Sequence, residues 1–406
     1  MLKKLIHKVL RHRHFWRDAT FDELSEVYIA MAFRSFALGM IGIFVPVYIL
    51  TLGYGISTVA LFYAVYFLCR IFLDFAAAYV IARFGPKHTL FIGYVVQILA
   101  AGSFSLVGAI GFPLYLSALI WGAASSLTFT SLHVDFSKIK HSDHGGKEVG
   151  YLNILQRVGG MIGPLIGGVV ATLFNPELLF ATAVLVLLLG LLPLFKTAEP
   201  VKTRQKLAFR ELRVDKIKRD FLSVSFLYVE NNLRVVLWPA FLTLFVFAEN
   251  IYGTIGILAS LGFFTSITAA YFAGKLVDSQ KGWLLLRVTS IANAFVYGLR
   301  PFAQSVVGVL GINVISDSLT VAYRIPFKKG FYDAADQHPG LRIVYITSVE
   351  AFGSLIKSVV WVQLFLLTYV LSTYQVIVAG FIIAGVCSIL MNTQRFTALK
   401  RTDNGR

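Results

Sequence analysis

Long apolar runs separated by short polar connections fill almost the whole of this 406-residue chain. Hydrophobic residues make up 57% of it and charged residues 14%, and its mean hydropathy is +0.73, which is too apolar for a soluble globular protein. About 20 consecutive apolar residues cross the hydrocarbon core of a bilayer as one helix. The sequence therefore predicts an all-α polytopic membrane protein of about twelve transmembrane helices.

The predicted spans form two sets of six, separated by a polar stretch with nine Lys or Arg residues at 196–220. The first set covers 28–50, 58–80, 89–110, 113–134, 149–173 and 178–195, and the second covers 222–247, 253–276, 283–302, 305–323, 343–367 and 373–391. The expected organisation is a cytoplasmic amphipathic segment at 1–27, an N-terminal six-helix half at 28–195, a cytoplasmic linker at 196–221, a C-terminal six-helix half at 222–393 and a cytoplasmic tail at 394–406. A disordered basic tail is the alternative for 1–27, which has no continuous apolar stretch like that of a signal peptide.

Lys and Arg residues are distributed very unevenly between the two sides of the predicted bundle. Of the 37, 31 fall in the two termini, the linker and the loops on one side. Positive residues near spans are retained in the cytoplasm, so both termini are expected to be cytoplasmic. This distribution explains the net charge of +16 without a nucleic-acid partner. A bacterial cytoplasmic membrane is the default location.

Two loops repeat at an offset of 196 residues: AYVIARFGPK from Ala78 and GKLVDSQKG from Gly274. The second resembles the G-x-x-x-D-R-x-G-R-R loop signature of the major facilitator superfamily (MFS), at Gly274 and Asp278. In the first copy, the family's aspartate is Ala82, followed by Arg83 and Gly85. The resemblance implies an MFS fold of two pseudo-symmetric halves. It also implies that these loops latch the halves together, with gating residues Arg83, Gly85, Gly274 and Asp278.

Span 5 carries a second resemblance, to the motif of drug:proton antiporters in the same superfamily. Its fixed positions are all present: Gly150, Gly159, Gly163, Pro164, Gly167 and Gly168. The resemblance implies proton-coupled efflux of a small solute by alternating access. A close-packing glycine seam with no bearing on direction is the alternative. One departure is that span 4 has Ala118, four residues before Gly122, where such exporters usually carry an arginine.

Ionisable residues inside the spans are the best guide to a site, since each costs about 2.5 to 3.5 kcal/mol at mid-bilayer unless it faces a cavity or a partner. Spans 3, 6 and 12 have none in their interiors, and the superfamily's arrangement places helices 3, 6, 9 and 12 against lipid. The charged residues of the other spans are Arg34, Arg70, Asp74, Arg157, Glu230, Arg234, Asp317, Glu350 and Lys357.

Helical spacing places Asp74 beside Arg70 and Arg234 beside Glu230, so each pair shares a helix face. Arg34 and Glu230 occupy corresponding places in the two halves, and we predict an inner gate between them.

A central polar cavity is predicted at mid-membrane, lined by Glu350, Lys357, Asn313, Asp317 and Trp238, with Arg34, Glu230 and Arg234 as further cavity or coupling residues. Substrate sites of secondary transporters lie near the midplane between the repeats. Burial favours the neutral form of a carboxyl group, which makes Asp317 and Glu350 the candidate proton carriers. Alternatively, Lys357 neutralises Glu350 permanently. The expected substrate is a small polar, zwitterionic or amphiphilic molecule.

Other functional classes find less support. The chain has no GxxxxGK[ST], HExxH or GxSxG motif, so no enzyme is predicted. His133, Asp135, His141, Asp143 and His144 are read as a hydrated loop rather than a metal site. No cofactor is expected apart from a proton gradient, and the expected partners are the bilayer and the solute, with the chain acting as a monomer. A lipid-handling or sensor protein on the same fold and an uncoupled facilitator remain the alternatives.

Overall fold

The computed structural model describes residues 21–139, 145–192, 206–212, 214–278, 282–337, 340–394 and 396. Within its helices, the side chains of 21–28, 135–139, 145–157, 214–216, 274–275, 277–278 and 336 are not described.

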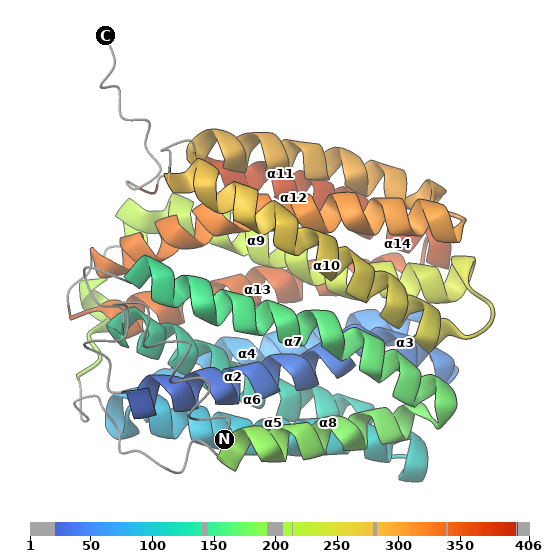
Figure 1. Cartoon of the computed structure of the whole chain (residues 1–406), viewed down its shortest axis with the longest axis horizontal. Coiled ribbons are helices and arrows are strands. Elements are labelled where there is room, and N and C mark those ends of the chain that lie inside the picture. Colours follow the sequence, from blue (N-terminus) through green and yellow to red (C-terminus); the bar gives the residue numbers. More distant parts are fainter. Residues whose placement is uncertain are drawn as a thin grey trace.

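All regular structure in these residues is helical, and it forms twelve spans (Figure 1). The first half contains α2 (Phe21–Gly42), α3 (Phe44–Thr51), α4 (Ile56–Phe84), α5 (Pro86–Ile110), α6 (Leu114–Ile139), α7 (Gly145–Leu173) and α8 (Pro176–Leu191). The second contains α9 (Val214–Phe241), α10 (Ile251–Asp278), α11 (Gly282–Leu299), α12 (Val306–Asp336), α13 (Arg342–Leu367) and α14 (Thr373–Leu390). Helices α2 and α3 follow one another across Ile43 and make one span. The predicted all-α polytopic fold is confirmed.

Several helices run past the predicted spans. α12 continues to Asp336 rather than ending near 323, and α9 begins at Val214 rather than at 222. The reason is physical: apolar composition marks only the part of a helix that lies in hydrocarbon, whereas the backbone hydrogen bonds continue through polar residues beyond it. Of the spans within the described residues, eight are long and apolar enough to cross a membrane, and two shorter apolar helices lie at Val158–Leu173 and Pro176–Leu191.

The two halves share one packing pattern. In the first half the extensive contacts are α2 with α7, α2 with α8, α4 with α6, α5 with α6 and α5 with α8. In the second they are α9 with α13, α9 with α14, α10 with α12, α11 with α12 and α11 with α14, which are the same five pairs six spans later. The halves meet along α4 with α13 and along α7 with α10. The bundle is therefore pseudo-symmetric, with the first half below the second in Figure 1.

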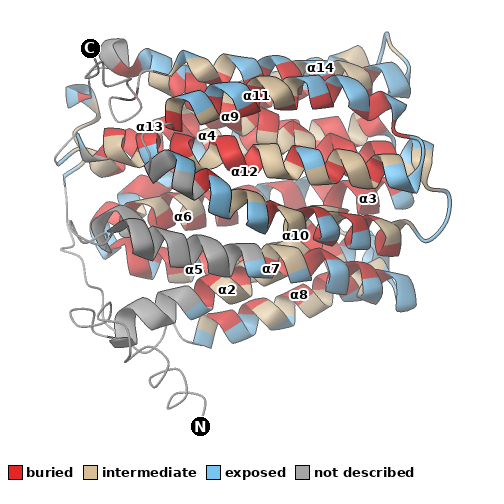
Figure 2. Ribbon diagram, turned by 45° about the horizontal axis from the view of Figure 1, so that its top comes forward, coloured by how far each residue is buried: buried red, intermediate tan, exposed pale blue. Residues whose placement is uncertain are grey.

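The lipid-facing surface is strongly apolar. Helices α5, α8, α11 and α14 make their extensive contacts only within their own half. Large side chains such as Leu185, Phe295 and Val307 stand 62%, 74% and 80% exposed. Figure 2 shows buried residues where helices face one another and exposed residues along the outside. Such a surface would aggregate in water and is satisfied by lipid tails.

The two ends of the bundle are named here by their turns. At the Gly85 end, α4 stops and α5 starts at Gly85, whose φ of +90° suits a residue without Cβ. At the Thr51 end, α8, α12 and α14 begin at side-chain caps from Asn175, Ser305 and Ser372. The predicted cytoplasmic side is the Gly85 end.

Candidate functional site

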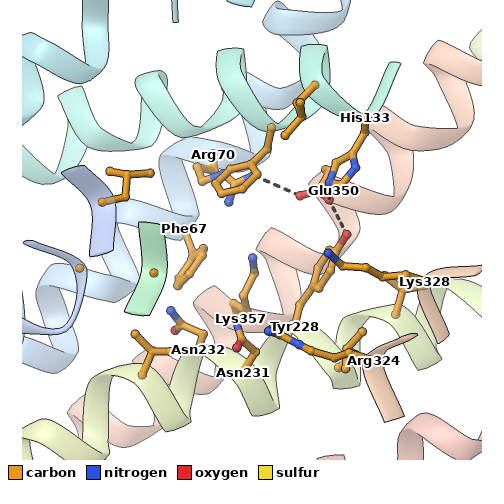
Figure 3. A pocket seen from close by; sticks show the side chains of 18 of the residues that line it. Phe67, Arg70, His133, Tyr228, Asn231, Asn232, Arg324, Lys328, Glu350 and Lys357 are labelled. Atoms are coloured by element: carbon orange, nitrogen blue, oxygen red, sulfur yellow. Dashed lines mark hydrogen bonds and ion pairs between the residues drawn. The ribbon is translucent and has the colours of Figure 1, made fainter. Parts of the chain in front are cut away.

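A cavity of about 590 Å³ lies between the two halves. Its walls come from α2, α4 and α6 of the first half and α9, α12 and α13 of the second, with Gly160 of α7 and Phe263 of α10 closing one side. Six side chains in its wall are basic: Arg34, Arg70, His133, Arg324, Lys328 and Lys357. Glu350 is the one acidic lining residue in the described part of the chain (Figure 3).

Glu350 of α13 is held by residues of three other helices. Arg70 on α4 donates from Nη2 to Oε2 at 3.2 Å, and the Tyr228 hydroxyl on α9 donates to Oε1 at 2.5 Å. His133 Nε2 of α6 lies 4.0 Å from Oε1. Arg70 also contacts Asp74 at 3.3 Å, as its spacing on α4 predicts. Asp74 in turn accepts a hydrogen bond from Ser354 of α13 at 3.1 Å. This network ties the halves together at the cavity wall.

Lys357 makes no direct ion pair with Glu350 in the described part of the chain. Its ammonium lies 4.3 Å from the ring centre of Phe67 and 5.1 Å from that of Tyr228. Among the described residues it forms no ion pair and no hydrogen bond. The direct ion-pair partner of Glu350 in this conformation is Arg70 on α4, which the spacing along α13 does not reveal.

The predicted gate between Arg34 and Glu230 is absent from this conformation. Arg34 donates to Thr128 Oγ1 at 3.0 Å and lies 5.0 Å from the ring centre of Phe129, both on α6 of its own half. Glu230 is fully buried in the other half, where it accepts from the Tyr297 hydroxyl at 2.5 Å. Corresponding positions in a repeat need not face each other, because each helix can turn the residue toward its own half.

A second polar cluster lies outside the cavity wall, among α9, α11 and α12. Arg234 pairs with Asp317 at 2.9 Å and not with Glu230. Trp238 donates from Nε1 to Asn313 Oδ1 at 2.7 Å. Of the predicted cavity residues, three line the central cavity: Arg34, Glu350 and Lys357. Contrary to the prediction, the other five are not among its lining residues: Glu230, Arg234, Trp238, Asn313 and Asp317.

Arg300, which follows α11, also belongs to this second cluster. It is 1% exposed and donates to Ser316 Oγ at 2.9 Å. Its guanidinium also lies 4.7 Å from the ring centre of Trp238. From the local sequence alone, a basic residue at the end of a span could face water or turn into the bundle, and the two cases look the same.

The span-5 glycines divide into two seams on opposite faces of α7. A Cβ on Gly159, Gly163 or Gly167 would come within 2.5–2.7 Å of the α2 backbone, in the same half. A Cβ on Gly168 would lie 2.6 Å from the Tyr252 carbonyl oxygen of α10, in the other half. Gly256 of α10 is equally close to the Pro164 carbonyl, at 2.5 Å. The motif thus lets α7 approach both its own half and the opposite half at backbone distance.

The loop residues are only partly described. Gly85 makes the turn between α4 and α5, and Arg83 is exposed beside it, 5.7 Å from the ring centre of Phe84. Gly274 and Asp278 lie in α10, and Gly150 in α7, outside the described side chains. Of the histidine and aspartate cluster, His141, Asp143 and His144 lie outside the described residues. The described part of the chain contains no group of three metal-ligating side chains.

Sequence reasoning missed several lining residues, namely His133, Tyr228, Asn231, Asn232, Arg324 and Lys328. Arg324 and Lys328 follow the predicted end of span 10 and were counted as loop charges, yet α12 carries them on as helix. The spacing of Asp317, Arg324 and Lys328 at helical intervals was the available signal.

Two pseudo-symmetric six-span halves around a central cavity define the chain as a transporter-type membrane protein. A family model described as Major Facilitator Superfamily matches residues 10–323, and the chain belongs to that family. Its members are membrane transporters and generally not enzymes. Among curated proteins, no match to the chain was found.

Proposed function

We propose that this protein is a secondary active transporter that moves a small solute across the cell membrane by alternating access, with proton-coupled efflux as its direction. The observation that carries the proposal is the Arg70–Glu350 ion pair, which joins the halves in the wall of the central cavity. A charge pair at this place can respond both to a bound solute and to a proton.

Alternating access is supported by unequal closure of the two ends. At the Thr51 end, Thr51 contacts the Tyr252 hydroxyl at 2.8 Å, and Phe44 packs on the Tyr252 ring at 5.5 Å. The cavity extends from mid-bundle toward the Gly85 end, where Lys328 and Tyr332 are among its lining residues. These features suit a state closed at the Thr51 end. If the Lys and Arg distribution sets the topology, that state faces the cytoplasm.

Proton coupling is best placed at Glu350. Of the two predicted carriers, Asp317 pairs with Arg234 inside one half, whereas Glu350 binds Arg70 across the interface. Protonation of Glu350 removes its charge and weakens its hold on Arg70, so it changes an interaction between the halves. The export direction is supported by the α7 glycine motif alone.

The test uses purified protein in proteoliposomes with a pH-sensitive dye inside. Polar, zwitterionic and amphiphilic compounds are added one at a time under an imposed proton gradient of either sign. A protein-dependent change of lumenal pH that Glu350→Gln abolishes is the expected result. Solute flux without proton movement would refute the coupling, and movement of a fluorescent phosphatidylcholine between leaflets without solute flux would favour the lipid-handling alternative.

A further inference from the structure

Among the described residues, the wall of the central cavity carries six basic side chains and one carboxylate. Its one described carboxylate, Glu350, is already bound by Arg70 and Tyr228. Lys357 and Arg324 form no ion pair among the described residues, although both are in the wall. A cation in a membrane-embedded cavity is costly unless a partner charge lies nearby.

Two asparagines of α9 strengthen this asymmetry. The Trp361 Nε1–H donates to Asn232 Oδ1 at 2.6 Å, and Arg234 Nη2 donates to Asn231 Oδ1 at 3.3 Å. Because both amide oxygens are engaged, each side chain offers its NH₂ group as the remaining hydrogen-bond partner. Neither NH₂ group has a hydrogen bond among the described residues, and both asparagines line the cavity near Lys357 (Figure 3).

Aromatic rings line the cavity next to these donors. Helices α4 and α6 run from the Thr51 end to the Gly85 end, so Tyr63, Tyr66 and Trp121 precede the charged residues on both helices. Tyr66 and Trp121 pack at 5.8 Å, and Tyr63 stacks on Trp361 at 5.1 Å. The basic side chains of Arg70, His133, Arg324 and Lys328 therefore lie nearer the Gly85 end than these rings, among further aromatic residues such as Phe327 and Phe331.

We infer that the cavity binds an amphiphilic organic anion, a carboxylate or phosphate joined to an apolar group, whose charged end meets Lys357, Asn231, Asn232 and Arg324. This inference rests on the proposed transport function. It narrows the expected substrate from polar, zwitterionic or amphiphilic molecules to amphiphilic anions. A ligand of this kind supplies a negative charge and acceptor atoms for these donors, while its apolar part lies against the rings. The same chemistry is available from a soluble metabolite or from an anionic lipid.

The test compares matched probes that differ only in charge. Benzyl, naphthyl, indolyl and decyl groups are each presented as a carboxylate, a phosphate monoester, the neutral primary amide and the ammonium. Binding to detergent-purified full-length protein is measured by thermal shift and isothermal titration. At least one scaffold is expected to bind as the anion and at least about tenfold more weakly as the amide or the ammonium. Equal binding of all forms, preference for the ammonium, or no binding by any probe would overturn the inference.

Two variants place the site. Asn232→Asp keeps the acceptor for Trp361 but replaces the NH₂ donor with a carboxylate oxygen, and Lys357→Met removes one charge at similar length. Each is expected to weaken anion binding at least about tenfold, with Lys357→Arg restoring most of it. Arg287→Met on α11, an exposed cation outside the cavity, is the control. Unchanged anion affinity in both variants would place the anion elsewhere and refute the site.

Further experiments distinguish a soluble anion from an anionic lipid, and distinguish failure of the anion site from failure of the proposed transport function. Saturable binding of soluble anions in phosphatidylcholine nanodiscs identifies a soluble ligand, whereas stabilisation by phosphatidylglycerol that Lys357→Met abolishes identifies a lipid. Either result supports the anion site. Anion binding without transport in the proteoliposome assay would refute the proposed function but not the anion site. Coupled transport of cations alone would support the proposed function and refute the anion site.

Discussion

Gly256 of α10 lies against the backbone of α7 in the other half, and Gly256→Ala tests whether α7 and α10 separate during the transport cycle. The added Cβ would stand 2.5 Å from the Pro164 carbonyl oxygen, whereas an ordinary contact begins at 3.4 Å. The two helices must therefore move apart by roughly 1 Å locally, because both sides of the contact are helix backbone. Overpacking of this size costs about 1–3 kcal/mol. The conformation closed at the Thr51 end should lose about 5- to 150-fold in relative population.

The measurement is the distance between spin labels at Leu52 and Phe302, two exposed positions at the Thr51 end of opposite halves. The labels are introduced after both native cysteines, Cys69 and Cys387, are changed to alanine. Gly256→Ala should enlarge the population with a long interlabel distance, in nanodiscs without added ligand.

Two further alanine variants of α7 serve as controls. Gly160→Ala meets nothing nearer than the Phe263 ring at 3.7 Å, so it should leave the distances unchanged. Gly163→Ala would clash with α2 at 2.7 Å inside one half, so it should lower the melting temperature without favouring separation. If Gly256→Ala gives the same distance distribution as Gly160→Ala, the seam between α7 and α10 does not control closure and the reasoning is wrong.

Three predictions concern the second polar cluster, each measured as the melting temperature in detergent with the exposed Tyr79→Phe as control. Asp317→Asn leaves Arg234 without its carboxylate partner and should lower the free energy of unfolding by about 3 kcal/mol. A combined Arg234→Met, Asp317→Leu change should recover most of that stability, and an equal loss of stability in both variants would argue against the pair. Tyr297→Phe removes a donor to the buried Glu230 and should cost about 1–3 kcal/mol, so an unchanged melting temperature would contradict that bond. Trp238→Phe removes the bond to Asn313 and should cost about 1 kcal/mol. Asn313→Ala should cost less in the Trp238→Phe background than alone, because only the Asn313 bond to the Leu258 carbonyl is then left to lose, and equal costs in the two backgrounds would contradict the pair.

Hydropathy, repeat and charge spacing were enough to predict much of this chain. Twelve spans in two halves follow from the length of the apolar runs, since a bilayer allows few other structures for such segments. The Arg70–Asp74 pair also follows, because residues four apart on one helix share a face. These features depend on local sequence and on the solvent, so no knowledge of packing is needed to find them.

Which charges face one another depends on how the helices pack. Glu230 lies four residues from Arg234 but binds Tyr297, and Glu350 lies seven residues from Lys357 but binds Arg70, which is 280 positions away in sequence. The rotation of each helix and the choice of its neighbour fix these partners, and both depend on the sum of many contacts along the whole helix. Apolar runs and their repeat are sufficient to predict a two-part helical bundle in a membrane. Packing decided that six basic side chains, two asparagines and one carboxylate meet in the described wall of its central cavity.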